Sequence, residues 1–364
     1  MANGILVCSP GSHKKNVGDY IQSVAQEQFW DTFDVYVERE SLNGFKYPEK
    51  TNVIMNGWFM WNPQNFPPSD CINPLFISFH LVPVIADKFL TPQSIEYLKK
   101  HEPIGARDYS TMNLLKKKGI DSYFSSCLTL TLGKKYKTDK NNGKTIFVDP
   151  YFPYAGTKYN YLNLIMYLKC LFYTFRYASK IKRFYTNITP EHRTVFSLVS
   201  KKLERIAVSS FFYHYYRTSF DIDTIANAEF VTHNMSSAFC KNNDEWMECA
   251  RRLIHKYAEA SLVITSRIHC GLPCLAVETP CVYINSDSLE NMKLRSPGRM
   301  EGLIELFHVV KWTRNGLVGV TDEIKEIMKK QKLSPNNVPV KLNYKEYANN
   351  LVKTVEEFVR DTRA

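Results

Sequence analysis

Short apolar runs rich in β-branched residues alternate with helix-length segments along most of the chain. In the clearest unit, the runs Leu262–Ile264 and Val282–Ile284 flank the segment Leu272–Glu278, which ends at Thr279-Pro280. Apolar runs of this length, bounded by turn-forming residues, are typical of strands buried on both faces of a parallel sheet. The pattern predicts a compact strand–helix–strand unit.

The first third of the chain shows the same alternation. We expect strands at Gly4–Cys8, Val35–Val37, Val53–Met55 and Leu75–Ile77, and a helix at Tyr20–Phe29. In βαβ units the carboxyl ends of parallel strands share one edge of the sheet, and ligands bind there. Asp19, Asn56 and His80 follow three of these strands and are expected on that edge. For His80, a buried structural role and a substrate contact are both open.

A polar, charged segment rich in turn formers, Gly133–Lys144, divides the chain. We expect residues 1–135 and 143–335 to form two Rossmann-like α/β domains that face a cleft, as in GT-B glycosyltransferases. The second of these begins with a strand at Thr145–Asp149. Residues 336–364 are expected to form a closing helix that packs back on the first domain.

The composition is that of a soluble globular protein. Among 364 residues, 44% are hydrophobic and 23% are charged, and the net charge is +11. Such a charge implies an acidic partner: nucleic acid, anionic lipid head groups, or a phosphorylated or carboxylated substrate. No helix-turn-helix, zinc-finger or RNP-type motif accompanies the charge, so nucleic acid is not expected as a partner.

The cysteines and the apolar runs predict the cellular compartment of the protein. The nine cysteines are odd in number, contain no Cys-x-x-Cys pair and stand mostly within apolar runs. Free thiols in a reducing compartment are therefore expected, and no metal site. The N-terminal apolar run is too short for a signal peptide, and no run has the length of a membrane-spanning helix. We expect a cytoplasmic protein.

Polar residues cluster where the first strand of the clearest unit meets its helix, at Thr265-Ser266-Arg267-Ile268-His269. Arg267 can bind an anion, and His269 can transfer a proton near neutral pH. Free N–H groups at the start of the helix also favour negative charge. By itself, however, an Arg-x-His pair is also common as an ordinary surface pair.

A second polar cluster follows a short strand that ends at Ile104. Arg107 lies on the next turn, and Asp108 or Ser110 caps a helix that ends at Gly119. An arginine at this edge can bind a carboxylate or a phosphate with two parallel hydrogen bonds.

Residues 9–19 form a loop with two glycines and two lysines ahead of the first helix, which suits an anion or a sugar hydroxyl. The loop matches neither the Walker A nor the G-x-G-x-x-G pattern. Asn16, Gly18 and Asp19 at its end are candidate ligand-binding residues. Asp19 is equally suited to capping the helix.

These three stretches resemble the polysaccharide pyruvyl transferase family. The family's motifs correspond here to Asn16-x-Gly18-Asp19, to Gly105-x-Arg107-Asp108 with Thr111 and the later Gly119-Ile120, and to Ser266-Arg267-x-His269 followed by Ala276 and Pro280. The family usually continues after the second motif with Asp-Pro-x-Leu-x-Leu. This chain has Ser126-Cys127-Leu128 instead, so the acid and the proline are missing.

The resemblance implies transfer of pyruvate from phosphoenolpyruvate to a sugar diol, giving a cyclic ketal during synthesis of a surface polysaccharide such as an exopolysaccharide or capsule. It needs no cofactor and no metal. Under it, His269 is the acid and base, and Asp19 orients or deprotonates the acceptor. Phosphoenolpyruvate would be bound by Arg107, Arg267, Ser266 and, on a later loop, Lys293, Arg295 and Arg299. The acceptor would be bound by Asn16, Gly18, Asn56 and His80.

Residues 150–190 contain six basic residues, twelve aromatic residues and no acidic residue. Their apolar stretch, Leu162–Phe175, is too short to span a bilayer. A basic, aromatic helix can lie among anionic lipid head groups, or it can be buried with its lysines reaching outward. The first alternative predicts a peripheral protein at the inner face of the cytoplasmic membrane that acts on a polyprenyl-diphosphate-linked sugar.

Two other functions fit the same fold expectation. A GT-B glycosyltransferase would use a nucleotide sugar, and only donor binding separates it from a pyruvyl transferase. A catalytically silent, glycan-binding relative would not need the histidine at position 269.

Overall fold

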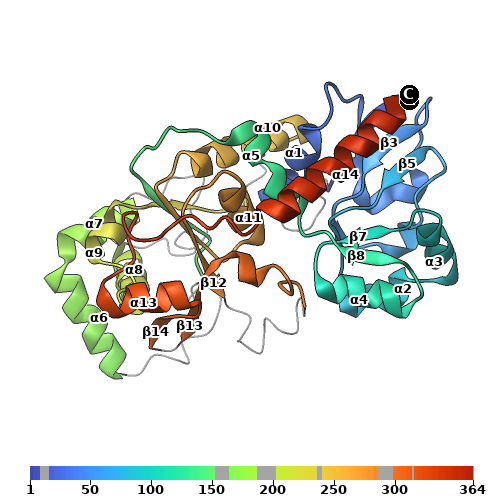
Figure 1. Cartoon of the computed structure of the whole chain (residues 1–364). Helices are drawn as coiled ribbons and strands as arrows, with labels where there is room; N and C mark the ends of the chain where they lie inside the picture. Colours follow the sequence, from blue (N-terminus) through green and yellow to red (C-terminus); the bar gives the residue numbers. More distant parts are fainter. Residues whose placement is uncertain are drawn as a thin grey trace.

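The computed structural model describes residues 1–8, 16–151, 164–186, 202–235, 240–285, 298–313 and 315–363. Within them, helices surround three sheets whose strands are parallel except for one edge strand. Figure 1 shows two of these sheets in the N-terminal half (residues 1–124) and the third in the C-terminal half (residues 145–330). The mixed α/β class is therefore confirmed. The two-domain GT-B arrangement and its cleft stay predictions.

The N-terminal half has two four-stranded parallel sheets, ordered β2-β1-β3-β5 and β4-β6-β7-β8. Their strands are β1 (Ala2–Val7), β2 (Val35–Glu38), β3 (Thr51–Ile54), β4 (Gly57–Phe59), β5 (Ile72–Leu75), β6 (Phe79–Leu81), β7 (Ile104–Ala106) and β8 (Ser122–Phe124). The helices are α1 (Val17–Glu27), α2 (Ala86–Phe89), α3 (Pro92–Lys99) and α4 (Tyr109–Lys117). The strands predicted from Val35, Val53 and Leu75 are present, the last shifted toward its N-terminus.

The C-terminal half has one six-stranded sheet, ordered β10-β9-β11-β12-β13-β14, in which β14 alone is antiparallel. Its strands are β9 (Thr145–Val148), β10 (Glu229–Val231), β11 (Leu262–Thr265), β12 (Cys281–Asn285), β13 (His308–Thr313) and β14 (Gly316–Gly319). The helices from the connecting segment onward are α5 (Gly133–Tyr136), α6 (Leu164–Arg176), α7 (Ala178–Thr186), α8 (Lys202–Tyr216), α9 (Ile222–Asn227), α10 (Asn243–Ala258), α11 (Ile268–Ala276), α13 (Asp322–Lys330) and α14 (Lys345–Arg363).

The predicted strand–helix–strand unit is confirmed as β11, α11 and β12, but α11 begins at Ile268 and not at Leu272. Pro273 lies inside this helix, and the backbone at His269 departs from helical angles, with φ −82° and ψ 16°. Proline has no N–H to donate to the carbonyl four residues earlier, and its ring crowds that carbonyl. The carbonyl in question belongs to His269. Pro273 thus explains the kink at the candidate catalytic histidine.

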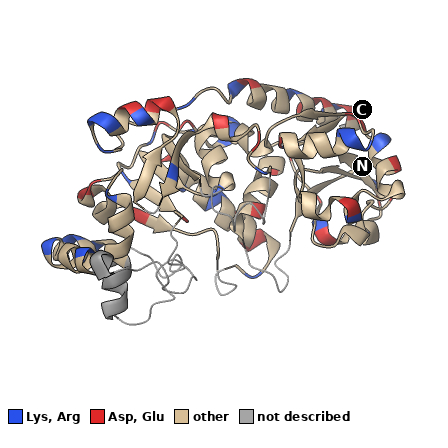
Figure 2. Cartoon of the chain, turned by 90° about the horizontal axis from the view of Figure 1, so that it is seen from below, with Lys and Arg blue, Asp and Glu red and all other residues tan. Residues whose placement is uncertain are grey.

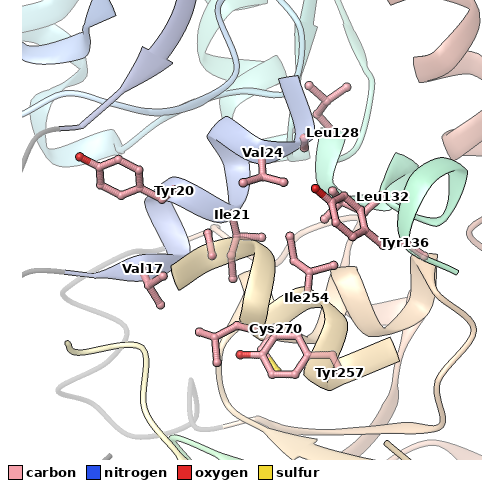
Figure 3. Packing of buried hydrophobic residues seen from close by; sticks show 14 of the residues in the cluster. Val17, Tyr20, Ile21, Val24, Leu128, Leu132, Tyr136, Ile254, Tyr257 and Cys270 are labelled. Carbon is pink, nitrogen blue, oxygen red and sulfur yellow. The ribbon is translucent and has the colours of Figure 1, made fainter. Parts of the chain in front are cut away.

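A single hydrophobic core joins the two halves. It contains residues of β1 and α1, of β9, α10 and α11, and of the segment between the halves. Figure 3 shows side chains of α1, α10 and α11 packed together with Leu128, Leu132 and Tyr136. The approach is closest at Gly133, where an added Cβ would lie 2.1 Å from the carbonyl oxygen of Ala276.

The C-terminal helix α14 crosses the same core. Leu351 and Val355 are buried in it, and Phe358 makes an edge-on contact with Trp30, at 6.4 Å between ring centroids. Tyr347 makes a similar contact with Phe124 of the N-terminal half, at 5.4 Å. Figure 1 shows α14 running from the neighbourhood of α11 toward the N-terminal sheets.

All nine cysteines are free thiols, and seven of them are buried. Within the described residues, no three His, Cys, Asp or Glu side chains are grouped so that they could hold a metal ion. None of the described helices combines the length and the apolar character needed to cross a bilayer.

Candidate active site

Arg107 lies on the turn between β7 and α4 and is 1% exposed. Its backbone N–H donates to the carbonyl of Phe79, and the next residue, Asp108, caps α4 by accepting from the N–H of Thr111 at 2.9 Å. The guanidinium Nε and Nη2 make no hydrogen bond to a described residue, and Nε lies 3.6 Å from Oδ2 of Asp108. Burial lowers the pKa of Arg107 to about 10, although Asp108 counteracts this. Charged donors that make no hydrogen bond at this depth are suited to an anionic ligand.

His80, on β6, packs against the same cap. Its Nδ1 lies 2.5 Å from Oδ2 of Asp108 and 3.2 Å from Oγ1 of Thr111. Burial, helped by Arg107, lowers the pKa of His80 to about 4 despite Asp108. The ring is therefore neutral at pH 7, and the carboxylate contact requires the proton on Nδ1. His80 is both a structural partner of Asp108 and a neighbour of Arg107, so its predicted contact with the acceptor stays a prediction.

His269 lies in the first turn of α11 with 6% of its surface exposed, and its Nε2 has no hydrogen-bond partner among the described residues. Its pKa is well below the ordinary value, chiefly because it is buried and then because Arg107 and Arg299 carry positive charge nearby. Burial and the neighbouring cations therefore keep this imidazole neutral in the free protein and disfavour its protonation.

Arg299 belongs to a segment of the C-terminal half that packs on α4 of the N-terminal half. The carbonyl of the nearby Glu301 accepts from the N–H of Tyr109 at 3.2 Å. Arg299 lowers the pKa values of His80, Arg107 and His269 alike. Both halves of the chain therefore contribute to one cluster of positively charged arginines and neutral histidines.

Ser266 and Arg267 lie beside an acid that sequence reasoning missed, Asp149. Arg267 donates from Nε to Oδ2 of Asp149 at 2.8 Å, and Ser266 donates from Oγ to the Asp149 carbonyl at 2.5 Å. The N–H of His233 also donates to Oδ2, at 2.9 Å. Burial opposes the charge, but Arg267 and His233 hold the pKa of Asp149 below its ordinary value. Asp149 thus fixes Arg267, whose side chain is 36% exposed.

The start of α1 lies against the C-terminal half. Asn16 caps the helix by accepting from the N–H of Gly18 at 3.0 Å, so the alternative that Asp19 caps it is wrong. The N–H of Val17 donates to the carbonyl of His233, and a Cβ at Gly18 would lie 3.1 Å from Nδ1 of that histidine. A side chain at position 18 would therefore require His233 or Asn16 to shift by a few tenths of an ångström.

Asp19 faces a buried arginine that sequence reasoning also missed. Nη1 of Arg39 lies 3.7 Å from Oδ1 of Asp19, and Nη2 donates to Sγ of Cys8 at 2.9 Å. The charge of Asp19 also raises the pKa of Arg107, which places the acid near the cationic group. No local sequence pattern signals Arg39, because its partners come from β1 and α1.

Asn56 is buried, and both ends of its amide are in use. Its Nδ2 donates to the carbonyl of Gln22 at 3.2 Å, and its Oδ1 accepts from Nε2 of Gln26 at 2.5 Å. The side chain thereby ties β3 to α1, and its predicted acceptor contact stays a prediction. The two remaining candidates, Lys293 and Arg295, lie outside the described residues.

The structure thus brings together Arg107, His269, Asp19 and His80 with Arg299, at the contact between the two halves. Fold and site define a class: an α/β protein with a buried cluster of arginines and neutral histidines. A family model described as polysaccharide pyruvyl transferase matches residues 16–288. The chain belongs to this family of enzymes, which act in polysaccharide biosynthesis by transferring pyruvyl groups.

Other comparisons add little to this assignment. No curated protein matches the chain significantly. Seven chains of solved structures do match. Among them is a functionally uncharacterised protein from Klebsiella pneumoniae, which is 14% identical, covers 82% of this chain over 91% of its own, and has a TM-score of 0.38.

Proposed function

We propose that the protein transfers pyruvate from phosphoenolpyruvate to two hydroxyls of one sugar, giving a cyclic ketal and inorganic phosphate. The observation that carries the proposal is the cationic group around Arg107. Its buried Nε and Nη2 make no hydrogen bond to a described residue, Asp108 is the only acid within 4 Å of Nε among them, and Arg299 adds a second positive charge. Phosphoenolpyruvate offers a carboxylate and a phosphate, both of which suit such donors.

In the proposed reaction His269 moves the proton. The neutral imidazole accepts the proton of the first acceptor hydroxyl as that oxygen bonds to C2 of the enol, and the methylene carbon C3 gains a proton from the imidazolium. The bond between C2 and the phosphate oxygen then breaks and phosphate leaves. The second hydroxyl bonds to C2 and gives its proton to the imidazole, which the first step left neutral. Arg107 and Arg299 stabilise the charge that grows on the leaving phosphate.

The remaining candidates take supporting roles in this proposal. Asp19 orients the acceptor hydroxyls, because it lies near Arg107 and its carboxylate does not cap α1. Arg267, held at Nε by Asp149, presents the rest of its guanidinium to the donor. In the stretch around Cys127 the family usually has an acid followed by a proline. This chain has a buried thiol near Arg107 there, so the stretch supplies no carboxylate that competes for the donors of Arg107.

A thermal-shift titration tests the donor. A ligand that binds only the folded state stabilises it by about 2.7 kcal/mol at roughly 100 times its Kd. We expect phosphoenolpyruvate to raise the unfolding midpoint of the wild type, and UDP-glucose and other nucleotide sugars to leave it unchanged. Arg107→Lys and Arg267→Ala should reduce the shift, whereas Arg360→Ala, an exposed arginine on α14, should not.

Stabilisation by a nucleotide sugar alone would overturn the proposal and favour a glycosyltransferase. Release of inorganic phosphate from phosphoenolpyruvate in the presence of acceptor, lost in His269→Ala, would separate the enzyme from a silent glycan-binding relative. A stabilised protein that never releases phosphate with any acceptor would favour that relative.

We also propose that the acceptor is lipid-linked and that the protein contacts an anionic membrane peripherally, at the inner face of the cytoplasmic membrane. On α6 the side chains of Leu168, Leu171, Phe172 and Phe175 are 52–81% exposed and follow helical spacing. Cys170 on the opposite face is buried with α8, so one face of the helix packs inside the protein and the other is free to meet lipid. Lys169 and Arg176 of the same helix are also exposed, and Figure 2 shows further basic residues at this end of the molecule.

A further inference from the structure

Two of the five tryptophans differ from the other three in their exposure to solvent. Trp30, Trp246 and Trp312 are at most 7% exposed, whereas Trp61 is 63% exposed and Trp58, on β4, is half-buried. The rings of Trp58 and Trp61 lie 4.5 Å apart between centroids, at an angle of 53°. Exposure of a large apolar ring to water is unfavourable, so a ligand that covers the ring of Trp61 would gain binding free energy.

The pair is held in place by charged residues of the neighbouring strand and turn. Oε2 of Glu40 accepts from the backbone N–H groups of Trp61 and Asn62, at 2.8 and 2.9 Å. Oε1 of the same carboxylate accepts from Nε of Arg39 at 3.2 Å, and the Arg39 guanidinium lies 5.3 Å from the centre of the Trp58 ring. The exposed ring of Trp61 therefore projects from a fixed backbone.

The same arginine connects the tryptophans to the candidate active site. Arg39 lies 3.7 Å from Asp19, and Asp19 acts electrostatically on Arg107. Contacts run from Trp61 through Trp58 and Arg39 to Asp19, and the charge of Asp19 acts on Arg107. A molecule covering Trp61 would extend toward the acid that we propose to orient the acceptor.

We infer that Trp58 and Trp61 form a stacking platform for a pyranose ring of the acceptor. A pyranose has an apolar face of C–H groups with hydroxyls at its rim, so it matches the exposed aromatic face of Trp61 with the polar groups of Glu40 and Arg39 beside it. This inference rests on the proposed function for its ligand, a sugar acceptor. It adds the place where the acceptor binds and the residues that select it.

The test follows the five tryptophans separately, in full-length protein labelled with 5-fluorotryptophan and observed by ¹⁹F NMR. The probes are methyl glycosides of glucose, galactose and mannose, with glycerol as a polyol that has no apolar ring face. We expect at least one glycoside to shift the Trp58 and Trp61 resonances and to leave those of Trp30, Trp246 and Trp312 in place. Glycerol should shift none of the five.

Matched variants complete the test. Trp61→Ala should weaken glycoside binding about three- to tenfold, as expected for loss of one stacked aromatic ring. Val84→Ala removes another exposed apolar side chain, 71% exposed, and should leave binding unchanged. If no glycoside shifts Trp58 or Trp61, or if Trp61→Ala binds as the wild type does, the platform is refuted.

The phosphoenolpyruvate titration separates this inference from the proposed function. Trp61→Ala should keep the full stabilisation by phosphoenolpyruvate, because the ring is not part of the donor site. Glycoside shifts at Trp61 without stabilisation by phosphoenolpyruvate would leave the platform standing and remove the pyruvyl donor. Stabilisation by phosphoenolpyruvate without glycoside shifts at Trp61 would refute the platform and support the pyruvyl donor.

Discussion

At the scale of single residues, the candidate site keeps its histidines neutral by burying them beside positive charge. His80 and His269 both have lowered pKa values, chiefly because they are buried and then because Arg107 and Arg299 are nearby. Taking a proton in the free enzyme would add a further charge to a buried cationic group. In the proposed reaction an anionic donor would offset the positive charge near His269, which would couple binding of the donor to the proton transfer that follows.

His80 gives a prediction about acid stability. Its pKa is about 4 in the folded protein, below the ordinary value of 6.5. Between these values the unfolded chain binds the proton and the folded protein does not, so stability falls as the pH is lowered through this window. We expect the wild type to lose about 2 kcal/mol more than His80→Gln between pH 7 and pH 4.5. Urea denaturation at the two pH values measures this difference.

A matched control is His255→Gln on α10, where the histidine is exposed. That variant should lose as much stability as the wild type over the same pH interval. Equal losses in the wild type and in His80→Gln would contradict the buried, neutral state of His80.

The candidate site residues that could be predicted from the sequence are those that stand in a recognisable local pattern. Arg107 and Asp108 follow a short strand and begin a helix, and His269 follows Arg267 at the end of another strand. Arg39 and Asp149 were missed, because each depends on partners more than 15 residues away in sequence. Tertiary packing alone makes them part of the site.

At the scale of elements, the start of α5 lies unusually close to the end of α11. Gly133 begins α5, and its Cα faces the last residue of α11, Ala276. The sequence places Gly133 at the start of a linker, where a glycine suggests freedom of the backbone. The structure assigns it the opposite role, since only the absence of a Cβ allows the two helices to approach this closely.

Gly133→Ala should therefore be destabilising. The added Cβ would lie 2.1 Å from the Ala276 carbonyl oxygen, so backbone must shift, and overpacking of this kind costs about 1–3 kcal/mol. Gly44→Ala has open space around its Cβ and should be neutral or slightly stabilising. Chemical denaturation compares the free energies of unfolding. Equal stability of the two variants would mean that the close approach is not maintained in solution.

Element boundaries show where local patterns stop being sufficient. The strands of the six-stranded sheet were predicted where runs of β-branched residues are buried on both faces, as at β11 and β12. The start of α11 was placed four residues late, because the polar residues before Leu272 look like a loop. Burial of His269 within the first turn, between residues of both halves, cannot be read from that segment alone.

At the scale of the whole molecule, the candidate active site and the exposed face of α6 lie in different regions. Figure 1 shows α6 at the end of the C-terminal half that is farthest from the N-terminal sheets. The core shared by α1, α10, α11 and α14 lies between them. If α6 contacts a bilayer, the site must be reached by an acceptor whose sugar extends away from its lipid anchor.

Vesicle binding tests this arrangement. The wild type should co-sediment with vesicles that contain phosphatidylglycerol, bind weakly to pure phosphatidylcholine, and be released as salt screens the charges. Phe172→Ser with Phe175→Ser should weaken binding at least about tenfold, since two exposed rings no longer insert. Val84→Ser, which changes an exposed apolar residue of the N-terminal half, should bind like the wild type. Unchanged binding of the double variant would refute contact through α6, and unaltered stabilisation of that variant by phosphoenolpyruvate would show that the donor site is intact.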